Sequence, residues 1–395
     1  MVSTRHVFFI DGFDPKGASS FYQKHSQELA QYSQLSGTTH TLGPRSRHSP
    51  TTSRWHCTTT LHGQTTNTTF DYLGWDDCVR SLWARTPLQL AGQALRSLWD
   101  FCTTGAARRL HRLAPATVRA ALFPYGLVLA AVLAAMVTTL VVYAGLSYAA
   151  MSATAVMVGG AVAAAASAYA AWRVLLRTPT TWFLRVVAFA NCLAHRESAA
   201  LEERVRTWSQ QISAALSAHQ ADEVLLVGYS AGSSLAVQVA AQVLQLASAG
   251  NAGSAAEVQR LVLLTLGNCI PVAAALPAAV QVRADIAAVA SHRLVWVDYT
   301  APIDWGSFPL VDPVTMRKAD PAPADAVALA TAPPTANRKF LSPQFHLLSS
   351  PDKYRAIKKD KYQVHQLYLK CPELLGRYDY FSMLYGHQSL QQRVF

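Results

Sequence analysis

The feature that most restricts this chain is an apolar segment near its middle. Residues 120–172 contain no Lys, Arg, Asp, Glu or His. About 20 apolar residues are enough for a helix to cross the ~30 Å hydrocarbon core of a bilayer. The segment can therefore hold two spans, which we place near residues 123–143 and 153–172, with Gly145–Tyr148 in the connection. The alternative is a pair of helices buried in the core of a large soluble protein.

Arginine side chains flank this segment on both sides, and none lies in its predicted turn. Lys and Arg near the ends of spans mark the cytoplasmic side of a membrane. We therefore expect a two-span hairpin in the cytoplasmic (inner) membrane, with the rest of the chain on the cytoplasmic side and the lipid bilayer as a partner. The flanking residues are Arg108, Arg109, Arg112 and Arg119 before the segment, and Arg173, Arg177 and Arg185 after it.

The same arginines explain the basic balance of the chain, whose formal net charge is +11. A nucleic-acid-binding protein would be expected to show a basic run interleaved with aromatic residues, or the spacing of a known DNA-binding motif. Neither is present, so we expect no nucleic-acid partner. The orientation of the predicted hairpin in a membrane explains the positive charge better than nucleic-acid binding does.

The second predicted span is rich in small residues, from Gly159 and Gly160 through to Ala168. Lipid supplies no hydrophobic drive between helices, so spans associate by close backbone approach at small side chains. Such a surface allows tight packing inside the hairpin. It equally allows a homo-oligomer, and the sequence leaves both possibilities open.

The remaining chain is long enough for one large α/β domain. Residues 1–74 are expected to form its first part, residues 75–195 an insertion that carries the hairpin, and residues 196–395 its second part. Continuous apolar runs separated by helical stretches predict a mainly parallel, doubly wound sheet covered on both faces. The predicted strands are 6–10, 224–227, 261–266 and 294–297, with a β-hairpin over 51–75; the predicted helices are 18–34, 180–219, 231–247 and 272–290, with an amphipathic stretch over 75–113 and an exposed loop over 318–336.

The clearest chemical signal is Gly228-Tyr229-Ser230-Ala231-Gly232. Four apolar strand residues precede it and a long apolar helix follows, which is the context of a nucleophile elbow. Glycines two residues on either side allow the tight turn, and the helix N-terminus favours negative charge near the serine. A phosphate-binding or purely structural Gly-Ser turn is the alternative.

With these residues the chain resembles the α/β-hydrolase superfamily, and the resemblance covers most of the sequence outside residues 75–180. It implies that an acid and then a histidine follow the serine along the chain. Asp304 lies after the second strand beyond the elbow and is preferred as the acid. Its rivals are Asp298, within or at the end of that strand, and Asp312, further along.

The histidine is the most open of these assignments. Such a histidine is expected in a loop before a last helix, and His365 precedes the helix-like stretch Gln366–Lys370. His387 follows Gly386 in a turn and is the main rival, and His346 is a further candidate. If His365 is the base, Lys361–Val364 is expected to supply the last strand; if it is His387, residues 378–386 are.

A serine hydrolase also needs two N–H donors for the oxyanion that forms on attack. The amide of Ala231, directly after the serine, is the expected first donor. The resemblance implies a second from the loop after an early strand, where we choose Phe13. Related hydrolases often have His-Gly at the position of Asp11-Gly12, so this loop departs from the family pattern.

No cofactor is expected, because the chain has no dinucleotide or phosphate-loop motif and its six cysteines show no metal-ligand spacing. The insertion lies where related hydrolases often have a lid, which would hold the substrate pocket near the membrane. We therefore expect a membrane-anchored serine hydrolase (esterase or lipase type) acting on lipid or other hydrophobic acyl esters. A thioesterase or acyltransferase with the same residues, or a non-catalytic membrane scaffold, are the alternatives.

Overall fold

The computed structural model describes residues 1–177, 180–250, 255–292, 294–318 and 337–395. The predicted loop over 318–336 lies outside the described residues except for Lys318. The strands are β1 (Thr4–Ile10), β2 (Thr39–Leu42), β3 (Ser46–Ser49), β4 (Thr52–Leu61), β5 (Gln64–Leu73), β6 (Glu223–Tyr229), β7 (Leu261–Leu266), β8 (Val295–Tyr299), β9 (Val311–Asp312), β10 (Arg317–Lys318) and β11 (Arg338–Leu341).

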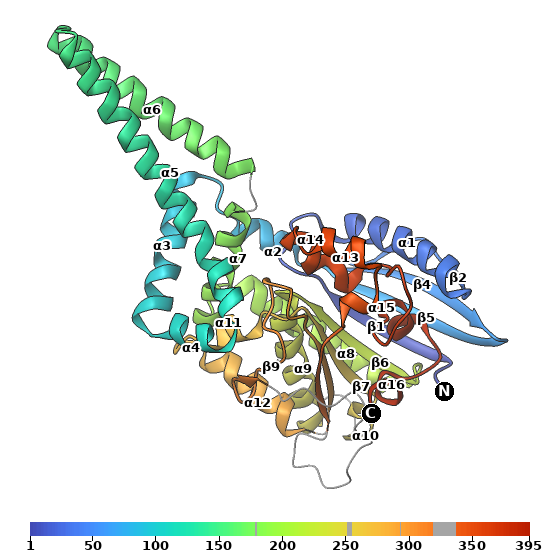
Figure 1. The fold of residues 1–395 in the computed structure, drawn as a ribbon. Helices are drawn as coiled ribbons and strands as arrows, with labels where there is room; N and C mark the ends of the chain where they lie inside the picture. Colours follow the sequence, from blue (N-terminus) through green and yellow to red (C-terminus); the bar gives the residue numbers. More distant parts are fainter. Residues whose placement is uncertain (178–179, 251–254, 293, 319–336) are drawn as a thin grey trace.

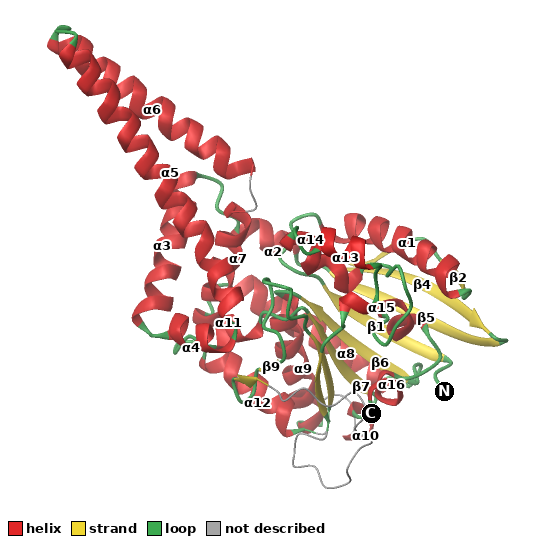
Figure 2. Cartoon of the chain, in the orientation of Figure 1, coloured by secondary structure: helices red, strands yellow, loops and turns green. Residues whose placement is uncertain are grey.

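Helices make up most of the rest of the described chain (Figure 2). Those before the elbow are α1 (Gly17–Ser36), α2 (Asp76–Leu82), α3 (Pro87–Thr103), α4 (Ala106–Leu113), α5 (Pro115–Tyr148), α6 (Ala153–Arg177), α7 (Thr180–His195) and α8 (Ala199–Ser217). Those after it are α9 (Gly232–Ser248), α10 (Ala255–Val258), α11 (Ile270–Ala274), α12 (Val280–Ser291), α13 (Pro351–Ile357), α14 (Lys361–Gln366), α15 (Tyr380–Tyr385) and α16 (Leu390–Val394), with 3₁₀ turns η1 (Phe345–Leu347) and η2 (Leu367–Leu369).

The central sheet has the order β11-β8-β7-β6-β1-β5-β4-β2, and β3 also pairs with β4. The pairs from β11 to β5 are parallel, whereas β4 pairs with its neighbours antiparallel. The expected mixed α/β fold with a mostly parallel sheet is therefore present. The β-hairpin over 51–75 is also present, and its turn residues His62 and Gly63 both have positive φ, as a tight two-residue hairpin turn requires.

Helices cover both faces of this sheet, as Figure 1 shows. Successive strand residues point to opposite faces, so β6 contributes Leu226 to one core and Val227 to the other. Helices α8, α9 and α12 pack over the first core, and α1 and α15 contribute to the second. The sheet is therefore buried on both faces, which explains why its parallel strands are continuously apolar.

The prediction of one continuous helix over 272–290 is wrong, because the structure has two separate helices there, α11 and α12. Pro277 lies between the two helices. A proline disfavours the helical conformation of the residue before it and cannot donate the backbone hydrogen bond. The chain therefore breaks at this proline before α12 begins.

Helices α5 and α6 form an antiparallel pair that projects away from the body of the molecule (Figure 1). Both are long and apolar enough to cross a membrane. In their most apolar stretches, none of the α5 residues and only 11% of the α6 residues are buried. The alternative of a helix pair buried in a soluble core is therefore wrong.

The predicted connection at Gly145–Tyr148 is also wrong, because α5 continues through these residues. The turn lies at residues 149–152, where Ala150 has φ 51°. A single glycine costs a helix only about 1 kcal/mol. Gly159 on α6 faces α5 closely: a Cβ there would lie 2.3 Å from the Leu146 Cδ1 atom. Gly159 thus serves packing within the hairpin, whereas Ala161, Ala164, Ala165, Ala166 and Ala168 are exposed.

Candidate active site

The loops that follow four parallel strands meet at one edge of the sheet. Strands β1, β6, β7 and β8 are hydrogen-bonded side by side and run in the same direction. Their carboxyl ends therefore lie together, and the loops after them bring residues from distant parts of the sequence to one place. These residues are Phe13 after β1, Ser230 after β6, Cys269 after β7 and Asp304 after β8.

Ser230 lies in a tight turn between β6 and α9, and its φ is 54°. This left-handed conformation is uncommon for a residue with a side chain and stores backbone strain. The glycines on either side permit it. A Cβ on Gly228 would lie 2.6 Å from the Ser233 Cα atom, and one on Gly232 would lie 2.3 Å from the carbonyl oxygen of Asp11. Any larger residue at these positions would displace the backbone.

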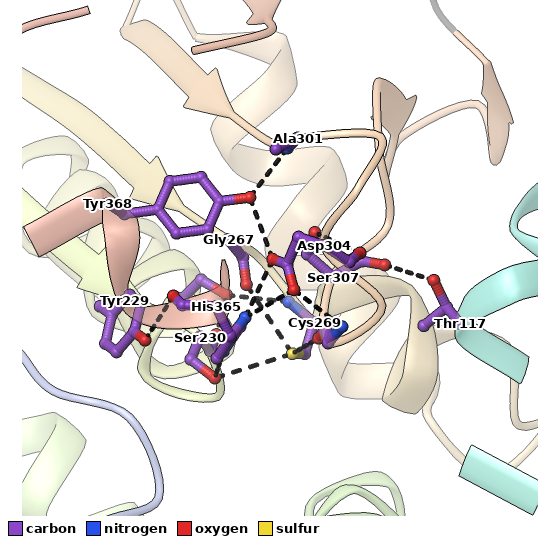
Figure 3. Close-up of polar contacts among 12 residues, drawn as sticks. Thr117, Tyr229, Ser230, Gly267, Cys269, Ala301, Asp304, Ser307, His365 and Tyr368 are labelled. Atoms are coloured by element: carbon purple, nitrogen blue, oxygen red, sulfur yellow. Dashed lines mark hydrogen bonds and ion pairs between the residues drawn. The ribbon is translucent and has the colours of Figure 1, made fainter. Parts of the chain in front are cut away.

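The structure brings Ser230, His365 and Asp304 into one hydrogen-bonded row (Figure 3). The His365 Nε2 atom lies 2.8 Å from the Ser230 Oγ atom. The Nδ1 atom lies 2.9 Å from Oδ2 and 3.1 Å from Oδ1 of Asp304. An ionised carboxylate can only accept hydrogen bonds, so we assign the proton of the neutral ring to Nδ1. Nε2 is then free to accept the hydrogen bond that the serine hydroxyl donates.

The carboxylate of Asp304 is fully buried and held from several sides. The Gly306 amide donates to Oδ1 at 2.8 Å, and the Tyr368 hydroxyl donates to Oδ2 at 3.0 Å. Burial alone would raise the pKa of Asp304, but the charge that His365 carries when it is protonated, together with the hydrogen bonds from His365 and the Gly306 amide, holds that pKa below its ordinary value. Asp304 is therefore an anion that fixes the orientation and tautomer of His365.

The rival acids occupy other surroundings. Asp298 lies inside β8, where it accepts hydrogen bonds from Thr265 at 2.5 Å and Asn268 at 2.7 Å. Burial raises the pKa of Asp298 to about 7 although these hydrogen bonds act to lower it. Asp312 lies in β9, and its Oδ2 atom is 3.9 Å from the Nη2 atom of Arg338. Neither carboxylate is hydrogen-bonded to His365.

The rival histidines lie elsewhere. The backbone carbonyl of His387 accepts a hydrogen bond from the Val2 amide, next to the amino end of β1. His387 therefore lies at the amino ends of the parallel strands, whereas Ser230 lies at their carboxyl ends. His346 lies in η1 with its ring against Tyr354. Neither histidine makes a hydrogen bond to Ser230 in the described part of the chain.

His365 lies on helix α14, not in the expected loop, and Lys361–Val364 belongs to the same helix, not to a last strand. That strand is β11. The stretch Gln366–Lys370 is mainly the 3₁₀ turn η2. Asp360 explains the difference, because its side chain accepts hydrogen bonds from the amides of Tyr362 and Gln363 and so caps the helix.

The two expected oxyanion donors flank Ser230 from separate loops. A Cβ on Gly12 would lie 3.2 Å from the Ser230 Cβ atom, so the loop after β1 passes directly over the serine. The Phe13 ring stacks on Trp83, and its carbonyl accepts a hydrogen bond from Trp182 at 3.1 Å. Among the described residues, nothing accepts a hydrogen bond from the amide of Phe13 or of Ala231. Both amides therefore remain available to a ligand.

Two neighbours of this row were missed from the sequence. Tyr368 binds Asp304 and also accepts a hydrogen bond from the Ala301 amide at 2.8 Å. The Cys269 Sγ atom lies 3.9 Å from the Ser230 Oγ atom and 3.1 Å from the carbonyl oxygen of Gly306. Burial and the charge of Asp304 raise the pKa of Cys269 to about 12, so the thiol stays protonated. No sequence signal marks either residue.

A cavity of about 660 Å³ opens from Ser230 and His365 towards the base of the hairpin. Its wall is almost entirely apolar and comes mainly from α3, α4, the first turns of α5 and α7. Residues of α9, α11 and α14 and of the loop after β8 complete it. Representative lining residues are Leu98, Phe101, Leu110, Val118, Phe123, Phe183, Val187 and Leu193. Its size and apolar wall are typical of a site that buries most of a hydrophobic ligand.

No group of three or more His, Cys, Asp or Glu residues in the described part of the chain is arranged to hold a metal ion. The chain matches no known family model, and it shows no significant similarity to a curated protein or to a solved structure.

Proposed function

We propose that the protein is a membrane-attached serine hydrolase that cleaves hydrophobic acyl esters. The observation that carries this proposal is the hydrogen-bonded row from Ser230 through His365 to Asp304. A nucleophile bonded to a base, which a third group orients, is the signature of nucleophilic catalysis. The strained turn at the serine and the two free amides beside it also support nucleophilic catalysis.

We further propose that the fold is of the α/β-hydrolase type. The serine follows β6, the acid follows β8 two strands later, and the histidine follows β11 at the edge of the sheet. This chain order of serine, acid and histidine is the order of that superfamily. The inserted helices α2–α7 lie between β5 and β6 in the chain, and α3, α4, α5 and α7 among them line the cavity.

In the proposed reaction His365 takes the proton of Ser230 as the hydroxyl attacks the ester carbonyl. The amides of Phe13 and Ala231 donate to the oxyanion, and the Asp304 carboxylate stabilises the imidazolium that forms. His365 then protonates the departing alcohol, leaving an acyl-serine. His365 then takes a proton from water as the water attacks this acyl group, and it returns the proton to the Ser230 Oγ atom as the acid leaves.

Hydrolysis of a series of p-nitrophenyl esters with increasing acyl length tests this function. Each methylene that enters an apolar cavity gains about 0.8 kcal/mol, so we expect kcat/KM to rise about fourfold per methylene. The rise should stop when the cavity of about 660 Å³ is full. Purified full-length protein that hydrolyses no ester would contradict the proposal, and a profile that falls from the shortest chain would contradict the role of the cavity.

We propose that α5 and α6 cross the cytoplasmic membrane with both outer ends on the cytoplasmic side. A cysteine placed at Ala150, in the turn, should react with a membrane-impermeant maleimide in intact cells, because the turn would emerge on the far face. A cysteine placed at His48, an exposed position in the soluble body, should react only after the cells are opened. Both variants belong in a Cys102→Ser background, because Cys102 is exposed. The reverse labelling pattern would overturn this topology.

A further inference from the structure

The cavity wall carries positive charge but no negative charge. Among its lining residues Arg119 and Lys361 are cations, and none is Asp or Glu. Neither cation is paired with a carboxylate in the described part of the chain, although most arginines of the soluble body bind a carboxylate or a backbone carbonyl. An apolar cavity with an unpaired cation on its wall is suited to an amphipathic anion.

Lys361 lies close to the reacting groups. It is the first residue of α14, and His365 follows four residues later, so both side chains lie on the same face of the helix. The Lys361 Nζ atom lies 4.5 Å from the centre of the Trp305 ring, and Trp305 directly follows Asp304. The ammonium group thus lies over the ring of the residue that follows the acid, and Lys361 belongs to the cavity wall together with His365.

Arg119 places the second cation on a different element. It lies near the start of α5, before the exposed apolar part of that helix begins at Leu122. Its side chain is exposed and also belongs to the cavity wall. A ligand whose acyl chain lies along the apolar helices would therefore meet a cation both beside the reacting groups and near the base of the hairpin.

We propose that the substrate is an anionic acyl ester, with a phosphate or carboxylate on the alcohol side of the scissile bond, and that Lys361, aided by Arg119, binds this anion. The inference rests on the proposed function and adds the class of its substrate. The apolar wall takes the acyl chain, while the anion stays with the alcohol that leaves. Lys361 acts by binding the charged group and takes no part in proton transfer.

Two esters of the same fatty acid test this specificity, one with glycerol phosphate and one with glycerol, presented to the full-length protein in micelles of a neutral detergent. We expect kcat/KM to be higher for the phosphate ester. A hydrogen bond to a charged group at a partly exposed site supports a change of about tenfold. Lys361→Gln should lower the ratio of the two kcat/KM values by that factor, and Lys361→Arg should retain most of it.

Lys359→Gln is the matched control, because Lys359 is exposed, lies two residues away and is not part of the cavity wall. This variant should keep the wild-type ratio. An unchanged ratio in Lys361→Gln, with both esters still hydrolysed, would overturn the inference and leave the proposed function intact. A wild-type protein that hydrolyses p-nitrophenyl esters but neither glycerol ester would also overturn the inference alone, whereas one that hydrolyses no ester would overturn the proposed function itself.

A second arm separates binding of the substrate anion from binding of an anionic membrane surface. The glycerol ester is presented in micelles that also contain an anionic detergent. The inference predicts that Lys361→Gln and the wild-type protein respond equally to this addition. If the anionic surface accelerates only the wild-type protein, Lys361 senses the lipid surface and the proposed substrate class is wrong.

Discussion

Replacing Ser230 with alanine should lower kcat for ester hydrolysis by about 10⁴- to 10⁶-fold, the usual cost of removing the nucleophile of such a row. The hydroxyl is the atom that forms the acyl intermediate, and the described residues offer no substitute. Cys269 is the nearest other nucleophile, but its raised pKa keeps it protonated. Steady-state kinetics on a p-nitrophenyl ester measures the loss.

The fold should survive this substitution, because alanine removes one oxygen and keeps the Cβ that the strained turn already accommodates. Thermal unfolding followed by circular dichroism checks this. Ser248→Ala is the matched control, since Ser248 lies at the far end of α9 and bonds only its own helix, at the carbonyl oxygen of Leu244. Retention of more than about a tenth of the activity in Ser230→Ala would identify the wrong serine.

Replacing His365 with alanine should cause a loss of similar size, because the serine then has no base. The double variant Ser230→Ala/His365→Ala should lose little more than either single variant, since these residues act as a unit. His387→Ala should cost less than about tenfold, which is below the contribution of a general base, because His387 lies at the opposite edge of the sheet. A double variant whose loss of activity equals the product of the two single losses would contradict the assignment. So would a larger loss of activity from His387→Ala than from His365→Ala.

The parallel sheet and the elbow were predictable from local pattern. Continuous apolar runs define β6 and β7 within about two residues, and the spacing of Gly228 and Gly232 around Ser230 is itself the steric requirement of the turn. The hairpin was predictable for the same reason, because long uncharged segments have few other stable environments. Its turn was misplaced because a glycine at position 145 does not by itself end a helix.

The sequence reduces the candidates for the acid and the histidine that act with Ser230 to a few residues, but it does not decide between them. Asp298 and Asp304 are six residues apart, and their different surroundings depend on Thr265, Asn268 and Tyr368 from other parts of the chain. The conformation of α14 depends on the Asp360 cap, in a helix of six residues that has little apolar periodicity. The cavity is formed by elements from distant parts of the chain that meet only in the folded protein, so no local pattern predicts it.

Labelling with a fluorophosphonate tests the central claim most directly, because this reagent phosphonylates a serine, with loss of fluoride, only where a base and an oxyanion site activate it. The purified wild-type protein should gain one phosphonyl group, located on Ser230 by peptide mapping. Ser230→Ala should gain none, His365→Ala should react far more slowly, and heat-denatured wild-type protein should not react. A folded wild-type protein that stays unlabelled, or that is labelled at another residue, would contradict the assignment of Ser230 as the nucleophile.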